Sequence, residues 1–208
     1  MLVLIYLVLI ITVVYYGFGE RFSQPKALTR LPGLAHEFSG DKDKYLTGNK
    51  LYLDNRDFAF VCDFKTKVPQ GILFFVGGNV DQYWTYLTLY FSVGDLYLSW
   101  FVDNYSMATY LIAKGLTDGQ RYHMNLIMTP NHPNKVIFVV GEGDSKVKTM
   151  ISTSEEPEKI LGSRIYLGGA PWNLPLDVLK RAGAFTGSIA NVFFQTKGKL
   201  IANLNNFA

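Results

Sequence analysis

The chain has 208 residues, of which 20 are basic and 17 acidic, and its formal net charge is +3. The two signs are mixed along the chain, and no basic stripe of the kind that nucleic-acid binders carry stands out. Aromatic residues make up 15% of the chain, and Tyr and Phe far outnumber Trp, which favours strands. The composition therefore predicts a globular, mainly β protein without a nucleic-acid partner.

Residues 1–19 differ in kind from the rest, because 1–18 contain no charged side chain. One interpretation is a signal peptide, since Gly17 and Gly19 supply the small residues that precede a cleavage site, here before Glu20. Another is a signal anchor, because residues 1–18 just reach the length that spans a bilayer. A buried core strand is a third interpretation. The first two both enter the secretory route, so we expect a secreted or membrane-anchored protein. Its folded domain would lie outside the cytoplasm, and this segment would be its one membrane contact.

Residues 20–33 contain two prolines and four charges without an apolar period, which predicts a linker. From residue 34 to 203, short β-rich runs alternate with breaks rich in Gly, Asn, Asp and Pro, as in an antiparallel all-β sandwich or barrel. Gly77–Asn79 is expected to be one such break, and helices are expected only at Glu155–Leu161 and Leu176–Ala182. The expected strands are Lys50–Leu53, Phe58–Lys65, Gly71–Val76, Trp84–Phe91, Asp95–Val102, Met107–Ala113, Tyr122–Met128, Val136–Val140, Val147–Ile151, Arg164–Leu167 and Ser188–Gln195.

Alternation within the strands predicts which faces are buried. In Phe58–Phe64 the even positions are Phe, Phe, Cys and Phe, so Cys62, the single cysteine, is expected on a buried face. The run Trp84–Phe91 has no strongly charged face, as expected deep inside a sheet that is covered on both sides. In Asp95–Phe101, one face is apolar and the other carries Tyr97, Ser99 and Phe101. That second face is either a ligand platform or a surface packed beneath a loop.

The order of these runs resembles the laminin G-like family, over roughly residues 34–201. The strand Phe58–Lys65 followed by Thr66, the hairpin around Gly94-Asp95, and Thr117–Gln120 each resemble a family segment. The two closing signatures resemble Arg164–Pro171 and Phe185–Val192. The resemblance implies a concanavalin A-like jelly-roll β-sandwich.

Two departures from the family pattern bear on function. Ser188 stands where the family usually has a cysteine, and Thr85 stands where the calcium-binding members have a carboxylate. Because a hard cation needs charged oxygen ligands, we expect no required cofactor and at most weak calcium binding. Asp81, Asp103 and Glu158 are the loop acids that could compensate at the rim.

No segment carries a convincing catalytic motif. Glu142-Gly143-Asp144 lacks the third acid of glycan hydrolases, and His36, His123 and His132 lack zinc-site spacing. We therefore expect a binding module and not an enzyme.

The resemblance implies an adhesion-type role, in which rim loops bind matrix glycans or receptor ectodomains. The candidate contacts to sulfated glycans are Lys135, Lys146, Lys148 and Arg164, and Asn104 begins a glycosylation sequon. A lectin-like or glycan-hydrolase sandwich acting on neutral glycans is the alternative. A secreted structural module tethered by its N-terminal segment is a third possibility.

Overall fold

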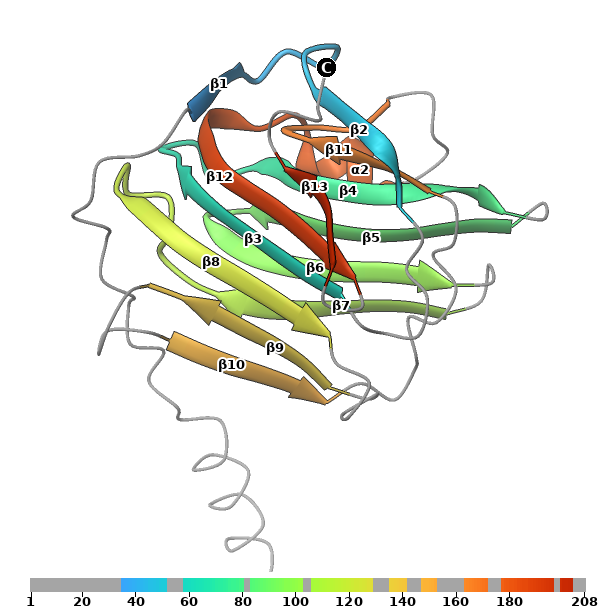
Figure 1. Cartoon of the computed structure of the whole chain (residues 1–208). Coiled ribbons are helices and arrows are strands. Elements are labelled where there is room, and N and C mark those ends of the chain that lie inside the picture. Colours follow the sequence, from blue (N-terminus) through green and yellow to red (C-terminus); the bar gives the residue numbers. More distant parts are fainter. Residues whose placement is uncertain are drawn as a thin grey trace, which may run out of the picture.

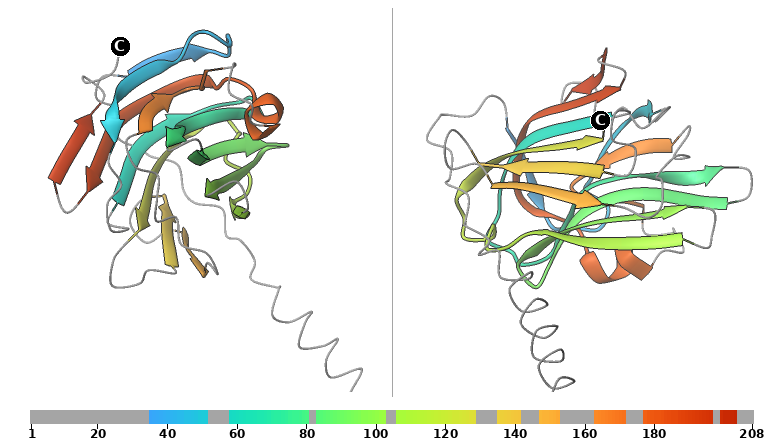
Figure 2. Two further views of the ribbon diagram at one scale, coloured as in Figure 1. Left: turned by 90° about the vertical axis from the view of Figure 1, so that its right-hand side faces the viewer. Right: turned by 90° about the horizontal axis from the view of Figure 1, so that it is seen from below.

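The computed structural model describes residues 35–51, 58–80, 83–102, 106–128, 135–141, 147–152, 163–171, 177–196 and 199–203. Within them, two antiparallel sheets pack face to face around one main core (Figures 1 and 2). The expected all-β sandwich is confirmed.

The first sheet has seven strands in the order β1-β12-β3-β8-β9-β10, with β13 also paired to β12. β12, with 11 residues, is the longest strand of the sheet. β1 pairs with its beginning and β13 with its end. The strands are β1 (Ala35–Ser39), β3 (Phe58–Lys65), β8 (Arg121–Met128), β9 (Lys135–Val140), β10 (Val147–Ser152), β12 (Thr186–Thr196) and β13 (Lys199–Asn203).

The second sheet has six strands in the order β2-β11-β4-β5-β6-β7. β5 lies inside it, and its side chains from Thr85 to Leu89 are buried on both faces, as the uncharged sequence of this strand predicts. The strands are β2 (Leu46–Leu51), β4 (Gly71–Val80), β5 (Tyr83–Ser92), β6 (Asp95–Val102), β7 (Ser106–Ala113) and β11 (Ser163–Leu167).

The core forms because alternate residues of both sheets point inward. In β3, Phe58, Phe60, Cys62 and Phe64 are at most 1% exposed, which confirms the predicted face of this strand. Across the core, β6 contributes the apolar face that ends in the fully buried Trp100. The opposite faces of these strands are thereby turned to solvent or to covering segments.

The short helix α2 (Asp177–Ala182) covers part of the outer face of the six-stranded sheet. Its Ala182 joins a second apolar cluster with Phe75 and Tyr86. On the same outer face Tyr97 stacks on Tyr90, with 5.8 Å between ring centroids. Stacking between neighbouring strands therefore accounts for part of the aromatic surface found in the sequence. Within the described residues, no helix combines the length and apolar character needed to cross a membrane.

Several element boundaries differ from the sequence predictions. Gly77–Asn79 is not a break, because β4 continues to Val80; at Gly77 a Cβ would lie 2.8 Å from the Cβ of Tyr86, so the glycine fits a crowded sheet. The strand expected at Lys50–Leu53 begins earlier, at Leu46, and its described part reaches Leu51. β1 and β13 were not predicted, because β1 is an exposed edge strand with one buried side chain. Helix Leu176–Ala182 is confirmed as α2, whereas Glu155–Leu161 lies outside the described residues.

Candidate functional site

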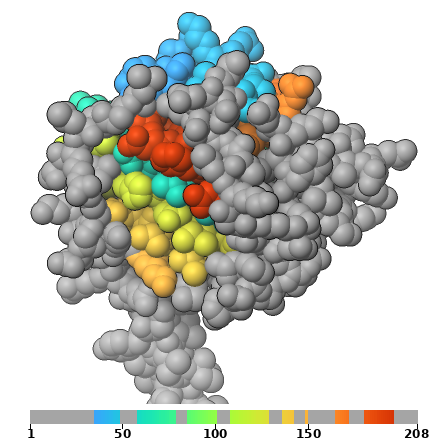
Figure 3. Space-filling view, viewed as in Figure 1, coloured from blue at the N-terminus to red at the C-terminus, as the bar shows by residue number. Residues whose placement is uncertain are grey.

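A row of polar side chains crosses four neighbouring strands at one end of the seven-stranded sheet. The register pairs Glu37 of β1 with Ser188 of β12, Ser188 with Lys65 of β3, and Lys65 with Arg121 of β8. These pairs place the row on one face, where β3 ends and β8 and β12 begin (Figure 1). Figure 3 shows the same strands meeting in a continuous surface on that face.

A cavity of about 340 Å³ opens along this row of side chains, at the same end of the sheet. We call it the cationic cavity, because the described residues of its lining include three basic side chains and one carboxylate. Its lining residues are Glu37, Lys65, Thr66, Lys67, Val68, Arg121, Thr186, Gly187 and Ser188.

Hydrogen bonds between loops that are distant in sequence shape the wall of the cavity. The buried Thr66 hydroxyl donates to the carbonyl oxygen of Thr186 at 2.7 Å and accepts from the Val68 amide at 3.0 Å. The Gly119 amide donates to the Thr66 carbonyl oxygen at 2.9 Å. The backbone at Gly187 has φ of +137°, and a Cβ there would collide with the Lys65 carbonyl oxygen, so only glycine permits this approach. Gly187 therefore permits the close approach of β12 to the end of β3.

The charges of the cationic cavity are unbalanced. Lys65, Lys67 and Arg121 form no ion pair with any residue that the structure describes, and Glu37 is the one carboxylate in the lining. The guanidinium of Arg121 offers a planar fork of donors, and the two ammonium groups add point charges. Such a cavity can bind a sulfate, phosphate or carboxylate group through charge-assisted hydrogen bonds.

The adjacent row of the same face holds a buried carboxylate. Asp63 of β3 is 5% exposed, and its Oδ1 lies 2.7 Å from Nδ1 of His123. Its Oδ2 accepts a hydrogen bond from Nδ2 of Asn191 at 2.6 Å. Asn191 has φ of +50° and sits where the register of β12 shifts. The sequence signal for this cluster was Asp63, an acid within a strand rich in phenylalanine. The sequence analysis considered His123 only as a zinc ligand and did not predict its contact with Asp63.

The candidate contacts named from the sequence are not gathered in one place. Lys148 is exposed on β10, at an edge of the seven-stranded sheet, whereas Arg164 is exposed on β11 of the other sheet. Lys135 begins β9, but its side chain is not among the described parts of the chain. The residues that lie wholly outside the described ranges are Asp81, Asp103, Asn104 and Lys146. Lys65, Lys67 and Arg121 were not among the candidate contacts named from the sequence, because only strand pairing brings them together.

The position of the family's calcium site is only partly described. Thr85 is 3% exposed, and its hydroxyl has no hydrogen-bond partner among the described residues. Among the described residues, no group of three or more His, Cys, Asp or Glu side chains could hold a metal ion. One neutral hydroxyl does not suit a hard cation. Asp81, Asp103 and Glu158 lie outside the described residues, so at most weak calcium binding stays a prediction.

Solved structures share this fold at low sequence identity. Domains LG4-5 of the mouse laminin alpha1 chain match with a TM-score of 0.62 and 17% identity, over 86% of this chain and 48% of that one. The LG1-3 region of the laminin alpha2 chain matches with a TM-score of 0.65 and 15% identity, over 86% of this chain and 34% of that one. The chain thus spans about half and about a third of the length of these two laminin structures.

A third structure is more distant in kind. The heptameric SAP-like pentraxin from Limulus polyphemus matches with a TM-score of 0.54 and 14% identity, over 77% of this chain and 74% of that one.

No curated protein matches the sequence. The family described as Laminin G domain matches residues 64–197, which is more than half of the chain. The chain therefore belongs to the laminin G domain family.

Proposed function

We propose that this protein is an extracellular binding module that recognises an anionic glycan through the cationic cavity. Laminin G domains are typically binding modules, which supports recognition over catalysis. The observation that carries the proposal is the presence of three cationic side chains around one cavity, next to the hydroxyl of Ser188, that form no ion pair with any described residue.

The dimensions favour a glycan over a receptor ectodomain. A cavity of about 340 Å³ lies in the size range of small-molecule sites, whereas a stable protein–protein interface spreads over about 800 Å² on each partner. The charge favours an acidic glycan over a neutral one, because unpaired cations gain charge-assisted hydrogen bonds only from an anion. The glycan-hydrolase alternative has no comparable support among the described residues, since the Asp63 carboxylate is occupied by His123 and Asn191.

The proposal is tested by measuring the binding of carboxylated, sulfated and neutral oligosaccharides to the full chain. Lys65→Ala and Arg121→Ala should each weaken the binding of an acidic oligosaccharide by about 10- to 100-fold, because each removes a charge-assisted hydrogen bond worth about 1.5–3 kcal/mol. The affinity should also fall as salt is added. Lys148→Ala is the matched control, since Lys148 is an exposed lysine of the same sheet outside the cavity.

Two outcomes would contradict the proposal. One is an equal loss in Lys148→Ala, which would show that binding depends on overall charge. The other is binding of neutral glycans only, which would favour the lectin-like alternative.

We also propose that residues 1–19 direct the protein into the secretory route, where residues 34–203 form the binding domain. Expression in a secretory cell should give protein in the medium that begins at Glu20, or a membrane-bound form with a lumenal domain. Either form should carry a glycan on Asn104. Cytosolic protein without that glycan would contradict both interpretations of the segment.

A further inference from the structure

The buried carboxylate of Asp63 and its partner His123 lie directly beside the cationic cavity. The register pairs Asp63 with His123 in one row and Lys65 with Arg121 in the next row of the same face. Diagonal neighbours on such a face are about 7 Å apart. Neither Asp63 nor His123 lines the cavity. This pair can therefore change the charge that an anion meets in the cavity without touching the anion.

His123 is the member of the cluster whose charge can change. Oδ1 of Asp63 lies 2.7 Å from Nδ1 of His123, and Oδ2 accepts a hydrogen bond from Nδ2 of Asn191. Because an ionised carboxylate only accepts hydrogen bonds, Nδ1 carries a proton in this pair. Nε2 is then the nitrogen that gains or loses the second proton. The His123 side chain is 38% exposed, so solvent reaches it.

The other charged groups around His123 are cations of fixed charge and its own partner. β3 contributes Asp63 and Lys65, and Arg121 precedes His123 on the same face of β8. β12 contributes an uncharged amide. On the remaining side, the backbone of His123 faces Gly141, whose amide donates to the His123 carbonyl oxygen. Histidine is the side chain whose charge ordinarily changes between about pH 5 and pH 8, whereas lysine and arginine stay cationic there.

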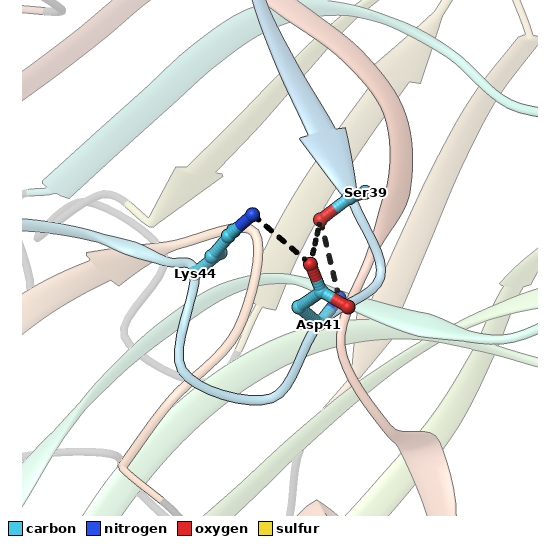
Figure 4. A network of polar contacts seen from close by, with 3 residues as sticks. All are labelled: Ser39, Asp41 and Lys44. Carbon is cyan, nitrogen blue, oxygen red and sulfur yellow. Dashed lines mark hydrogen bonds and ion pairs between the residues drawn. The ribbon is translucent and has the colours of Figure 1, made fainter.

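A second carboxylate pair at this end of the sheet keeps its charge (Figure 4). Gly40, in the loop between β1 and β2, lies against Thr186 of the cavity lining. In this loop the Ser39 hydroxyl donates to Oδ2 of Asp41 at 2.7 Å, and Nζ of Lys44 lies 3.3 Å from the same oxygen. The hydrogen bond from Ser39, and then Lys44, lowers the pKa of Asp41. This pair therefore stays ionised in mild acid and adds no pH dependence.

We propose that His123 makes the affinity of the cationic cavity for an anion depend on pH, with tighter binding in mild acid. This inference rests on the proposed function, because it assumes that an anion occupies the cavity. While the imidazole is neutral, the negative charge of Asp63 opposes the anion from the neighbouring row. Protonation of His123 offsets that charge, so Lys65 and Arg121 attract the anion more strongly.

The test measures the affinity of a sulfated oligosaccharide for the full chain at about pH 5.5 and about pH 8. Sulfate groups stay ionised at both values, so the charge of the ligand is constant. The wild-type affinity should be roughly two- to tenfold higher in acid, as expected for one unit charge about 10 Å from the anion. His123→Gln should bind at both pH values as weakly as the wild type does at the higher one. Its amide can donate to Asp63 but cannot gain a proton.

His36→Gln is the matched control, because it makes the same substitution at the other histidine of the described residues. His36 belongs to β1, its ring packs on Phe38, and it does not line the cationic cavity. This variant should keep the full pH dependence of the wild type. Melting curves check that both variants are folded.

Calorimetry of the unaltered protein gives a second measurement. Because linkage is reciprocal, a ligand that binds the protonated form more tightly must also draw protons onto the protein. Binding by the wild type near neutral pH should therefore take up protons, which the heats measured in buffers of different ionisation enthalpy reveal. His123→Gln should take up none.

A wild-type affinity that is equal at both pH values, with Lys65 and Arg121 still required, would overturn the role of His123 and leave the proposed function standing. A pH dependence that persists in His123→Gln, or is lost equally in His36→Gln, would overturn that role as well. Failure of sulfated and carboxylated oligosaccharides to bind at either pH value would overturn the proposed function and this inference together.

Discussion

At the scale of single residues, burial explains the chemistry of Cys62. The side chain is fully buried among the phenylalanines of β3, and burial raises the pKa of the thiol well above its ordinary value. A buried neutral thiol packs as a small apolar group. Cys62 is therefore part of the core, as the alternation of its strand predicts.

We expect Cys62→Ser to lower the free energy of unfolding by about 1–3 kcal/mol, because it places a hydroxyl on an apolar face. Glycan binding should be unchanged, since Cys62 does not line the cationic cavity. Denaturant unfolding measures the first effect. The native thiol should react slowly with an alkylating reagent, and rapid reaction would show that Cys62 is accessible.

At the scale of elements, a shift of register in β12 positions a polar cluster beside the cationic cavity. The pairing of β12 with β3 shifts between Ala190 and Phe193, and this turns Asn191 toward Asp63. Asn tolerates positive φ better than most side chains. Its amide and the ring of His123 then satisfy a carboxylate that would otherwise be buried without partners.

Asn191→Ala should therefore destabilise the protein by about 1.5–3 kcal/mol, as for a lost hydrogen bond to a charged group. Asn191→Gly is the matched variant, because glycine accepts the positive φ but offers no amide. Thermal unfolding of both should place Gly between wild type and Ala. A glycine variant as stable as the wild type would show that the bond to Asp63 contributes nothing.

The start of β8 carries a second polar contact between neighbouring elements. The Tyr122 hydroxyl donates to Oδ2 of Asp118 at 2.9 Å, while Oδ1 of Asp118 accepts from the Gln120 amide. Burial, followed by the hydrogen bond to Asp118 and its charge, raises the pKa of Tyr122 from 10 to about 12. The folded state therefore favours the neutral phenol.

Because this pKa is higher in the folded state, the resulting stability is complete below pH 10 and is lost as the pH rises toward 12. Tyr122→Phe should lack this part of the alkaline loss. The free energy of unfolding, measured for both proteins on either side of pH 10, checks it. Equal slopes in the two proteins would contradict the raised pKa.

At the scale of the whole molecule, the two ends of the sandwich differ in what they offer a ligand. The end with Lys65, Arg121 and the start of β12 presents cations that have no ion-pair partner in the described part of the chain. Thr85 lies near the start of β5, toward the other end, and supplies a buried neutral hydroxyl where the family pattern has an acid. The cationic cavity and the position of the family's calcium site therefore lie toward different ends of the sandwich.

We expect calcium to change the melting temperature by only a degree or so, measured in chelator and then in millimolar calcium. A site saturated a hundredfold would instead add about 2.7 kcal/mol of stability, which corresponds to several degrees. An upward shift of that size, abolished by Asp103→Ala, would show that loop acids have replaced the missing carboxylate.

The amino-acid sequence by itself determined the sheet class, most strand positions and the inward faces of β3 and β6. These follow from local rules: side chains alternate with period two, and turn residues stop each run. The burial of Cys62 and Trp100 needed no knowledge of the partner strands. The sequence did not predict β1, because this edge strand has one buried side chain and therefore no apolar alternation.

Only the tertiary structure decided where the candidate site lies. Thr66 and Thr186 are 120 positions apart, and Asp63 and Asn191 are 128 apart, yet each pair shares a hydrogen bond. The row from Glu37 to Arg121 exists because β1, β12, β3 and β8 are neighbours in the sheet, although they are far apart in sequence. The sequence pointed instead to scattered lysines and Arg164, because charge alone does not reveal which strands pair. Strand pairing brings distant cations together, and the unbalanced charge that results is the physical basis of the site.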